Sequence, residues 1–325
     1  MIAFNGLEPQ TDVPQLLAAS ARHFGSVSYQ ATEGYLRWLY AENPAASDYQ
    51  DCIVARRNGG IVGCMHRLVL PLLGGGRFVA LHNHFVDPAV RSGSGVLLLL
   101  QASKGADIAV APGVEEKLAP IYRRLRYHDV DGVWLAKPFS YLRVATGIGL
   151  AKLGVNSARA VKLPPSQSDI IVTATPSTEQ ISELRRRMVA KEAAYDGISW
   201  TDELVRWRYF HPDGPRHILI LSCSTDCYAV VAIGTRRGVR TARLMAIDCS
   251  ADQTWLSIVE AVSKNAGMAL GLAFTTEKGV ANALTKSGWK PRWNKTHTFS
   301  SPKQLGFISP AATDLGFESF GTEFT

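Results

Sequence analysis

The side chains best suited to chemistry in this chain begin with two histidines in residues 81–85. His82 and His84 are two positions apart in a segment with the apolar pattern of a strand, so we expect both on one face and Asn83 on the other. A histidine near its ordinary pKa can accept the proton of an ammonium group, directly or through water. Two histidines could also bind a metal, but no third ligand is spaced to join them, so no metal is expected.

A glycine-rich turn follows these histidines and leads into an apolar run at residues 96–100. Gly93 and Gly95 can adopt positive φ, and the start of the run at Val96 presents free N–H groups and the positive end of a helix dipole. Arg91 adds a fixed positive charge. This combination favours phosphate binding, although similar turns between a strand and a helix also occur without a ligand.

The elements that must position these residues occur twice along the chain. Each block opens with a helix carrying an Arg-Trp-x-Tyr pattern, around Trp38 in the first block and Trp207 in the second, and a proline follows each helix. Three strands, a helix, a fourth strand and a helix with an aromatic ending follow in the same order, which indicates an internal duplication. An α/β fold with a mixed sheet is therefore expected in each block. The strands are expected at residues 52–57, 61–73, 78–86 and 106–111, and at residues 218–223, 227–234, 241–248 and 269–275.

Composition bounds the class of protein. A chain of 325 residues with 46% hydrophobic and 19% charged residues is globular, with roughly two domains. We expect an N-terminal domain at 1–140, a linker at 141–177, a C-terminal domain at 178–300 and a tail at 301–325. No apolar run reaches the ~20 residues of a membrane span. The first residues lack the features of a secretory signal and the five cysteines are expected to be reduced, which predicts a cytoplasmic location.

The formal net charge of +7 favours an anionic partner, which could be nucleic acid, a phosphorylated small molecule or an acidic carrier protein. The densest basic run, residues 185–187, lies in a helix expected from residue 178, and we interpret it as a solvated helix face. No helix-turn-helix, zinc-finger or RNA-binding signature accompanies it, so no nucleic-acid partner is expected.

Two motifs and their order along the chain resemble the GNAT acyltransferase superfamily. The first, at residues 85–91, is Phe-Val-Asp-Pro-Ala-Val-Arg at the end of a strand, and the second, at residues 119–127, is Ala-Pro-Ile-Tyr-Arg-Arg-Leu-Arg-Tyr. The duplicated order is similar to that of tandem-domain members, and the resemblance covers residues 30–137 more fully than residues 195–300. It implies two GNAT-like domains in tandem, acetyl-CoA or another acyl-CoA as co-substrate, and acyl transfer to an amine.

The resemblance places the coenzyme at the end of the strand and along the glycine-rich turn. In the superfamily this turn reads Arg-Gly-x-Gly-x-Gly/Ala, whereas Ser92, Ser94 and Val96 occupy the glycine positions here. Either the loop is one residue shorter, with the two glycines in the same role, or it has another shape that weakens coenzyme binding. The predicted coenzyme contacts are Phe85, Val86, Arg91, Ser92, Gly93, Ser94, Gly95 and Val96.

The resemblance also implies roles for the chemical groups. Tyr122 matches the tyrosine that protonates the departing coenzyme thiolate in the superfamily, and the alternative is a helix tyrosine whose ring packs on the sheet. His84 is nearest the strand end where the superfamily splays its sheet, so it is the first candidate for the general base. His82 is the second candidate, and Asn83 is predicted to orient the substrate.

The second block lacks a glycine-rich turn, so we expect it to complete the acceptor pocket or to support the first domain rather than to bind coenzyme. Trp38 and Trp207 are candidate substrate contacts, with a position in the core as the alternative. Trp200 and Trp293 are further candidates for stacking on a ring-shaped acceptor.

The resemblance further implies that the acceptor is an amino sugar or another small amine. Two alternatives stay open, namely an acyl carrier protein as donor and a non-catalytic binding or scaffold module. One departure concerns the helix ending, since the superfamily has glycine before the last aromatic residue. The first block has Arg126 at this place and the second has Gly288.

Overall fold

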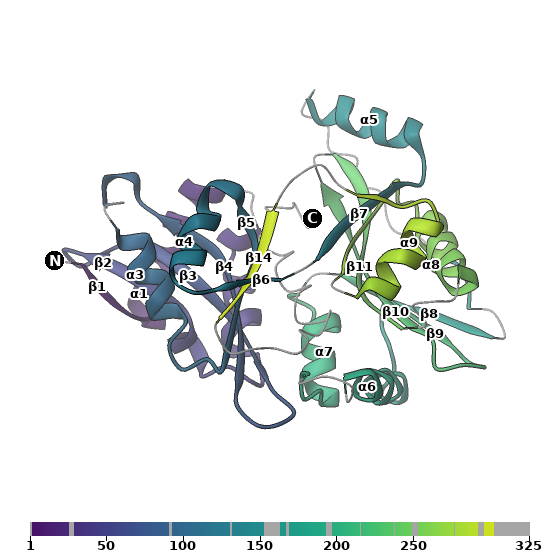
Figure 1. Ribbon diagram of the computed structural model, residues 1–325, viewed down its shortest axis with the longest axis horizontal. Helices are drawn as coiled ribbons and strands as arrows, with labels where there is room; N and C mark the ends of the chain where they lie inside the picture. The colour runs from purple at the N-terminus through teal and green to yellow at the C-terminus, as the bar shows by residue number, and fades with distance from the viewer. Residues whose placement is uncertain are drawn as a thin grey trace.

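The structure is a computed structural model of the 325-residue chain. It describes residues 2–25, 29–90, 93–130, 132–152, 163–166, 169–192, 197–214, 216–236, 238–248, 253–275, 277–291 and 296–301. These residues form two mixed sheets with helices packed against them, one sheet in each half of Figure 1.

Each sheet has seven strands within the described residues. The first has the order β1-β2-β3-β4-β5-β14-β6, and the second, read in the matching direction, has the order β8-β9-β10-β11-β12-β7-β13. In each sheet one pair is parallel, β4 with β5 and β11 with β12. The first sheet consists of β1 (Ala3–Gly6), β2 (Ile53–Arg57), β3 (Gly60–Pro71), β4 (Arg77–Val86), β5 (Ile108–Glu115), β14 (Thr296–Ser300) and β6 (His128–Asp129). The second consists of β8 (Ile170–Thr173), β9 (His217–Ser222), β10 (Tyr228–Arg236), β11 (Val239–Ile247), β12 (Leu270–Thr275), β7 (Val133–Pro138) and β13 (Lys290–Pro291).

Helices cover the sheets because side chains alternate between the faces of each strand. On one face of the first sheet, Leu68 and Phe78 pack in a core shared with helices α1 and α2 and with the π-helix η2. On the other face, Val69 and Val79 pack with helices α3 and α4. The helices are α1 (Pro9–Phe24), α2 (Glu33–Leu36), η2 (Arg37–Ala41), α3 (Ser94–Ala102), α4 (Ala119–Arg124), α5 (Tyr141–Lys152), α6 (Thr178–Glu192), α7 (Asp202–Phe210), α8 (Gln253–Asn265) and α9 (Lys278–Lys286).

The two sheets confirm the predicted α/β class and the tandem repeat. In each, a helix connects the two parallel strands, α3 in the first half and α8 in the second, and another helix follows, α4 or α9. The helix endings match in detail, since the amides of Tyr127 and Trp289 each donate to the carbonyl five residues earlier, at 3.0 Å. Arg126 (φ 62°) and Gly288 (φ 87°) precede these aromatic residues in the left-handed region. This backbone conformation is the physical reason for a glycine at that place.

The two sheets exchange one strand each. β7 follows β6 in the chain, but it pairs in the second sheet between β12 and β13. β14 follows β13, but it pairs in the first sheet between β5 and β6. Figure 1 shows β14, in yellow, among the blue strands of the N-terminal half. Neither half of the chain therefore forms its complete sheet without the other.

The repeated Arg-Trp-x-Tyr helices pack against each other where the two halves meet. The rings of Trp38 and Trp207 stack with centroids 5.3 Å apart and an interplanar angle of 18°. The indole of Trp38 donates to the carbonyl of Trp207 at 3.1 Å, and the indole of Trp207 donates to the carbonyl of Trp38 at 2.6 Å. This reciprocal contact joins equivalent residues of the two repeats inside one continuous core.

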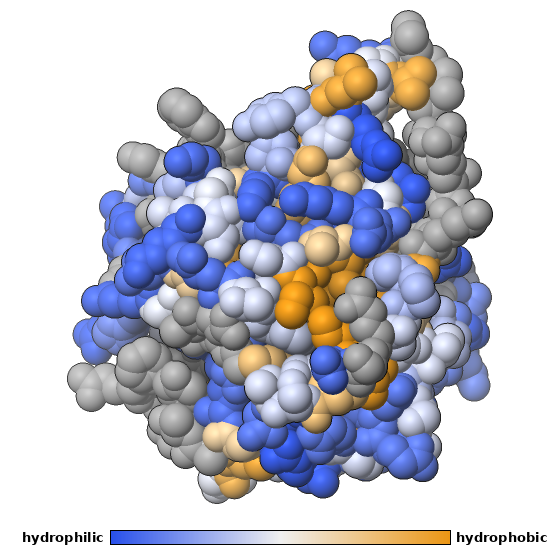
Figure 2. All heavy atoms as spheres, turned by 90° about the vertical axis from the view of Figure 1, so that its right-hand side faces the viewer, coloured by the Kyte–Doolittle hydropathy of each residue, from blue (hydrophilic) through white to orange (hydrophobic). Residues whose placement is uncertain are grey.

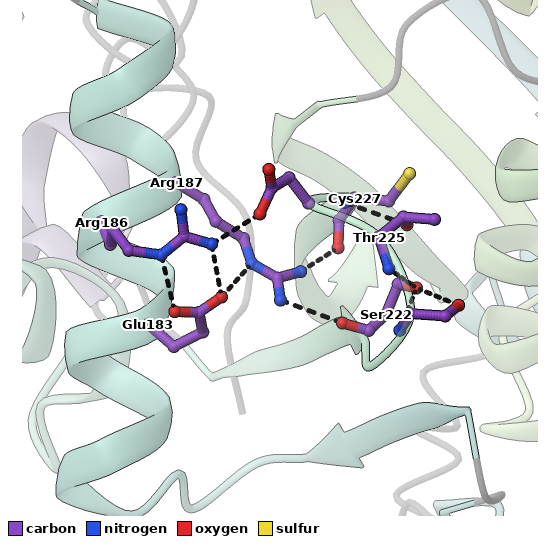
Figure 3. A network of polar contacts seen from close by, with 8 residues as sticks. Glu183, Arg186, Arg187, Ser222, Thr225 and Cys227 are labelled. Atoms are coloured by element: carbon purple, nitrogen blue, oxygen red, sulfur yellow. Dashed lines mark hydrogen bonds and ion pairs between the residues drawn. The ribbon is translucent and has the colours of Figure 1, made fainter.

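The basic run at residues 185–187 differs from the expected solvated helix face. Arg186 is half-exposed, but Arg187 is buried and donates to the carbonyls of Ser222 and Cys227, at 3.0 and 2.6 Å (Figure 3). Glu183, one turn earlier, lies 2.7 Å from Arg187 and 2.8 Å from Arg186. Arg187 thus anchors α6 to the turn between β9 and β10, and the expectation of solvation is wrong for this residue.

Further observations concern the cysteines, the segment expected as a linker, and the length and polarity of the helices. Cys227 is disulfide-bonded, so the expectation of fully reduced cysteines is wrong. The segment expected as a linker contains α5 and β8. Apolar residues at the top of Figure 2 lie where Figure 1 places α5, and Tyr141 and Leu142 of this helix are 79% and 75% exposed. In the part of the chain that the structure describes, every helix is too short or too polar to cross a bilayer.

Candidate active site

The first sheet opens into a wedge between its two parallel strands. β4 and β5 pair at three positions, the last of them Ala80 with Val110. β4 then continues to Val86 and β5 to Glu115, and no further pair joins the two strands within the described residues. Because the strands are parallel, the chain enters α3 and α4 at the end of the sheet where the wedge opens. Open α/β sheets bind their ligands at the carboxyl ends of strands, where neighbouring strands diverge.

A β-bulge deforms β4 beside this wedge. Beyond the pair His66–His82, a single residue of β3 opposes two residues of β4, Asn83 and His84. Asn83 has a φ of 49°, in the left-handed region that non-glycine residues seldom adopt. The bulge interrupts the alternation of the strand, so the expectation that His82 and His84 share one face is wrong. His82 contacts Tyr35, on the α2 side of the sheet, whereas His84 lies against α3.

Asn83 is held by a buried network beneath the bulge. Its Nδ2 atom donates to the hydroxyl of Tyr35 at 2.8 Å, and this hydroxyl lies 3.2 Å from Nδ1 of His82. Burial, with smaller effects from the charges of His66 and Arg208, lowers the pKa of His82 well below its ordinary value. His82 is therefore a neutral imidazole in the core, and its position favours support of Asn83, whereas its predicted catalytic role stays a prediction.

His84 lies at the start of α3. A Cβ atom at Gly95 would be 3.2 Å from Cε1 of His84 and 3.7 Å from Cγ2 of Val86, so glycine is what allows α3 to approach β4 so closely. Solvent reaches the His84 ring, but neighbouring protein atoms remove much of its hydration. This desolvation, together with the charge of His23, lowers the pKa of His84 to about 4. The imidazole is neutral at pH 7 and has a lone pair that can accept a proton.

The glycine-rich turn forms the beginning of α3, although the helix starts at Ser94 rather than at Val96. Gly93 caps the helix with a φ of 78°, as expected, while Gly95 lies inside the first turn. The amide of Val96 donates to the Gly93 carbonyl at 3.1 Å, and the Ser94 hydroxyl donates to the Val90 carbonyl. Among the described residues, the amides of Ser94 and Gly95 therefore stay available for a ligand at the positive end of the helix dipole.

Tyr122 lies in α4 on the same side of the sheet as α3. Its ring stacks on Phe299 of β14, with centroids 5.0 Å apart, and meets Tyr127 edge-on at 5.5 Å. Burial, and to a smaller degree Tyr127, raises the pKa of Tyr122 well above its ordinary value, so the phenol stays protonated. No described residue hydrogen-bonds to its hydroxyl. Tyr122 therefore packs its ring as a structural tyrosine would, while its hydroxyl donates no hydrogen bond to a described residue.

An aromatic group on the α1 side of β4 was not predicted from the sequence. The ring of Phe85 stacks on His23 at 5.3 Å and meets Phe24 edge-on at 5.9 Å. Both partners are the last residues of α1, far from β4 in sequence. Nothing in their spacing indicates this contact, and the same holds for Phe299 beneath Tyr122. Such groups are found only when the tertiary structure brings distant elements together.

The structure brings some of the predicted site residues together and leaves others apart. His84, Val86, Gly95 and Tyr122 lie around the wedge, on the α3 and α4 side. Trp38 and Trp207 are buried in the core between the halves, which favours packing, and their role in substrate binding stays a prediction. The predicted site residues Arg91 and Ser92, and also Trp293, lie outside the described residues, and Trp200 is buried.

The second sheet has a wedge of its own, and side chains from α6 and α9 line it. β11 and β12 pair up to Leu244 and then diverge. The ammonium group of Lys191, from α6, lies 2.7 Å from the carbonyl oxygen of Ile247 and 2.9 Å from a carboxylate oxygen of Glu277. Leu284 lines the same space, at the place that corresponds to Tyr122 in the first half.

No protein-family model and no curated protein sequence matches this chain. Its fold, however, matches solved structures along most of its length. A GCN5-related N-acetyltransferase from Kribbella flavida aligns with a TM-score of 0.56 and 14% identity, over 92% of this chain and 70% of that one. Saccharomyces cerevisiae N-myristoyltransferase with bound myristoyl-CoA aligns with a TM-score of 0.59 and 11% identity, over 93% of this chain and 82% of that one. A GCN5-related N-acetyltransferase from Anabaena variabilis gives 0.57 and 11%, over 92% and 72%.

These alignments identify the class of fold. The chain has the fold of the GCN5-related N-acetyltransferases, or GNAT fold, once in each half, in the tandem arrangement that aligns with N-myristoyltransferase. The resemblance inferred from residues 85–91 and 119–127 is therefore confirmed at the level of the fold. At identities of 11–14%, the alignments do not extend to the chemistry, which must be argued from the wedge itself.

Proposed function

We propose that this protein is an acyl-CoA-dependent N-acyltransferase whose active site is the wedge of the first sheet. The observation that carries the proposal is the position of the α3 amides of Ser94 and Gly95 at the mouth of that wedge, where β4 and β5 diverge. The aligned proteins support the donor, since two are N-acetyltransferases and the third was solved with bound myristoyl-CoA.

The donor binds with its pyrophosphate at the start of α3. The two free amides and the helix dipole attract the negative charge, and the net charge of +7 favours the approach of an anion. Gly95 keeps the helix close to β4, so the rest of the coenzyme can follow the strand into the wedge. The strand edges inside the wedge carry main-chain groups that no neighbouring strand pairs, and an N–H group there can polarise the thioester carbonyl.

Transfer to an amine requires the amine to lose its proton. His84 is the base that we propose, because it faces α3 at the wedge and its imidazole is neutral at pH 7. With a pKa of about 4 it is a weak base in the free protein. A bound pyrophosphate nearby would raise this pKa and strengthen the base, since an adjacent negative charge favours the imidazolium form. The amine lone pair then attacks the thioester carbonyl, and the thiolate leaves as the tetrahedral intermediate collapses.

Tyr122 is the group that we propose for the departing thiolate. Its hydroxyl is protonated and has no competing partner among the described residues. Because burial raises its pKa above the ordinary value of a tyrosine, and so above the value of about 8.5 for a thiol, a hydrogen bond to the thiolate is favoured over complete proton transfer. The thiolate leaves hydrogen-bonded to Tyr122 and takes up a proton from solvent, while His84 returns the amine proton to solvent.

For the acceptor we propose a small amine such as an amino sugar. The rings of His23, Phe24 and Phe85 border the α1 side of β4 and offer apolar faces against which a sugar ring could pack. The second half supports the first through the exchanged strands and the Trp38–Trp207 contact.

The test is calorimetric titration of the protein with acetyl-CoA, longer acyl-CoAs, free CoA and an acyl carrier protein. We expect one acyl-CoA bound per chain, and weaker binding in Gly95→Val. Binding of the carrier protein alone would replace the proposed donor. No response to any CoA would favour the alternative of a non-catalytic binding or scaffold module. If CoA binds, a panel of small amines is then screened by following release of the free thiol.

A further inference from the structure

A cluster of metal-binding side chains lies in the core of the first half, away from the wedge. Cys52 precedes β2, while Cys64 and His66 lie on β3, and all three are fully buried. The two Sγ atoms are 3.5 Å apart, and Sγ of Cys52 is 4.0 Å from Nδ1 of His66. All three candidate ligand atoms lie within 4.8 Å of one another.

These separations are close to those of a tetrahedral zinc site. With Zn–S bonds of about 2.3 Å and Zn–N bonds of about 2.0 Å, a tetrahedron has S···S edges of about 3.8 Å and S···N edges of about 3.6 Å. The two observed distances each differ from the corresponding edge by less than about half an ångström. A disulfide needs the sulfur atoms at about 2.05 Å, so the pair would have to move farther to close one.

The tautomer of His66 also suits metal binding. The hydroxyl of Tyr40, on η2, lies 2.8 Å from Nδ1 of His66. When Tyr40 donates to Nδ1, the ring proton is on Nε2, and the Nδ1 lone pair faces the cysteines. A metal can be coordinated by this lone pair in place of the Tyr40 hydroxyl. The oxygen of Tyr40 then lies at the fourth position of the site.

Charge balance favours a divalent metal in so buried a place. Two thiolates and a neutral imidazole carry a total charge of −2, which Zn²⁺ cancels, so the occupied site places no net charge in the core. Thiolates also select zinc over the hard cations Mg²⁺ and Ca²⁺.

We propose that Cys52, Cys64 and His66, with the Tyr40 hydroxyl at the fourth corner, form a structural zinc site. It ties β2, β3 and η2 together in the first half and leaves no open position for a substrate. His66 stacks on His82 at 5.9 Å, and His82 contacts Tyr35, so the site stiffens the layer that supports the bulge at Asn83. The proposal does not depend on the acyltransferase activity.

The first experiment measures zinc in the full-length protein after expression in zinc-supplemented medium. Elemental analysis is expected to give close to one zinc per chain in the wild type and in Cys223→Ser, a control at an exposed free cysteine. Cys52→Ser and Cys64→Ser are expected to contain less than about a tenth of that amount. Equal zinc in all four proteins, or no zinc in any, would overturn the proposal.

A second experiment uses only the wild type, since the variants could fail to fold. After removal of metal, free zinc at roughly 100 times its Kd is expected to raise the melting temperature by about 4 to 8 °C. Co²⁺ in place of zinc is expected to show the thiolate-to-cobalt charge-transfer band of a tetrahedral site. An unchanged melting temperature, an octahedral cobalt spectrum, or a Cys52–Cys64 disulfide in the mass spectrum would each refute the zinc site.

Discussion

The wedges of the two sheets have the same topology but different contents. In the first half, the diverging strands are flanked by a protonated tyrosine hydroxyl and by a helix whose first amides have no hydrogen-bond partner among the described residues. In the second half, Lys191 bridges β11 to Glu277 across the gap, and Leu284 stands where the first half has Tyr122. The repeat kept the residues that build the fold and changed those that face the wedge. This difference is the physical basis for assigning chemistry to the first half and support to the second.

The largest effect is expected from removing the hydroxyl of Tyr122, which has no counterpart in the second wedge. Tyr122→Phe should lower turnover by roughly ten- to a thousand-fold while leaving the Kd for acyl-CoA unchanged, because the ring still packs on Phe299. Steady-state kinetics and calorimetry on the same preparations give both values. Tyr127→Phe is the control, since its hydroxyl is already bonded to Ser103, and its turnover should stay within about threefold. Equal turnover in both variants would make Tyr122 a packing residue.

The second prediction concerns the close approach of α3 to β4. Gly95→Val places a branched side chain where even a Cβ atom would lie 3.2 Å from His84, so the helix must shift away from the strand. We expect the Kd for acyl-CoA to rise by roughly 10- to 100-fold, the equivalent of overpacking by about 1 to 3 kcal/mol. Gly149→Ala is the control, because a Cβ atom there meets no other atom within 4 Å. Unaltered affinity would mean that the coenzyme does not bind at this helix start.

The third prediction concerns the ion pair that spans the second wedge. Lys191→Met leaves the mostly buried carboxylate of Glu277 without its cation, and should lower the free energy of unfolding by about 2 to 3 kcal/mol. Urea denaturation measures this loss. The double variant Lys191→Met/Glu277→Gln should recover at least half of it, because no unpaired charge stays behind. If the double variant is as unstable as the single one, the pairing of the two charges is not what stabilises this wedge.

The fourth prediction concerns the pH dependence of the first wedge. Burial and the charge of His23 lower the pKa of His84 to about 4, so the basic form is present above that pH and is lost as the pH falls through it. At each pH, kcat/KM of the wild type is divided by kcat/KM of His84→Gln. The titration of the acceptor amine affects both proteins equally and cancels in this ratio. We expect this ratio to be constant from pH 8 to about pH 5 and to fall below that. A decline centred near pH 6.5 would show a histidine with an ordinary pKa.

The smallest effect concerns the matched helix endings. Arg126 has a φ of 62° where the second half has Gly288 at 87°, and a side chain in this region costs about 1 to 2 kcal/mol. Arg126→Gly should therefore stabilise the protein by about 0.5 to 1 kcal/mol, after the greater freedom of glycine in the unfolded chain is included. Gly288→Ala should destabilise it by about 1 kcal/mol. Urea denaturation of both variants measures the two effects, and changes of the same sign would show that the endings are not equivalent.

Much of the architecture could be predicted from local patterns. Alternating apolar residues and glycine turns place β3, β4 and β11 within a few residues of their observed ends, because strand period and turn chemistry are local properties. The repeated Arg-Trp-x-Tyr helices indicated the duplication. Arg187, however, belongs to a basic run that reads as solvated, and only its contacts with the carbonyls of Ser222 and Cys227 explain its burial.

The candidate site was less predictable, because bulges and exchanged strands depend on contacts between distant segments. The spacing of His82 and His84 implies a shared face, and the bulge at Asn83 separates them. The glycines of the turn were identified, yet the helix starts two residues earlier than expected and uses Gly95 for close packing. The position of β14 beside β5, which brings Phe299 under Tyr122, has no local signal at all.

The sequence by itself determined the elements of this protein, their order, and the repetition of that order, because hydrophobic period and turn residues act over short distances. Only the tertiary structure decided which groups line each wedge, how the halves exchange strands, and how Cys52 comes to lie beside Cys64 and His66. Those outcomes depend on pairing between segments far apart in the chain, where the free energy comes from burial and long-range hydrogen bonds rather than from local preference.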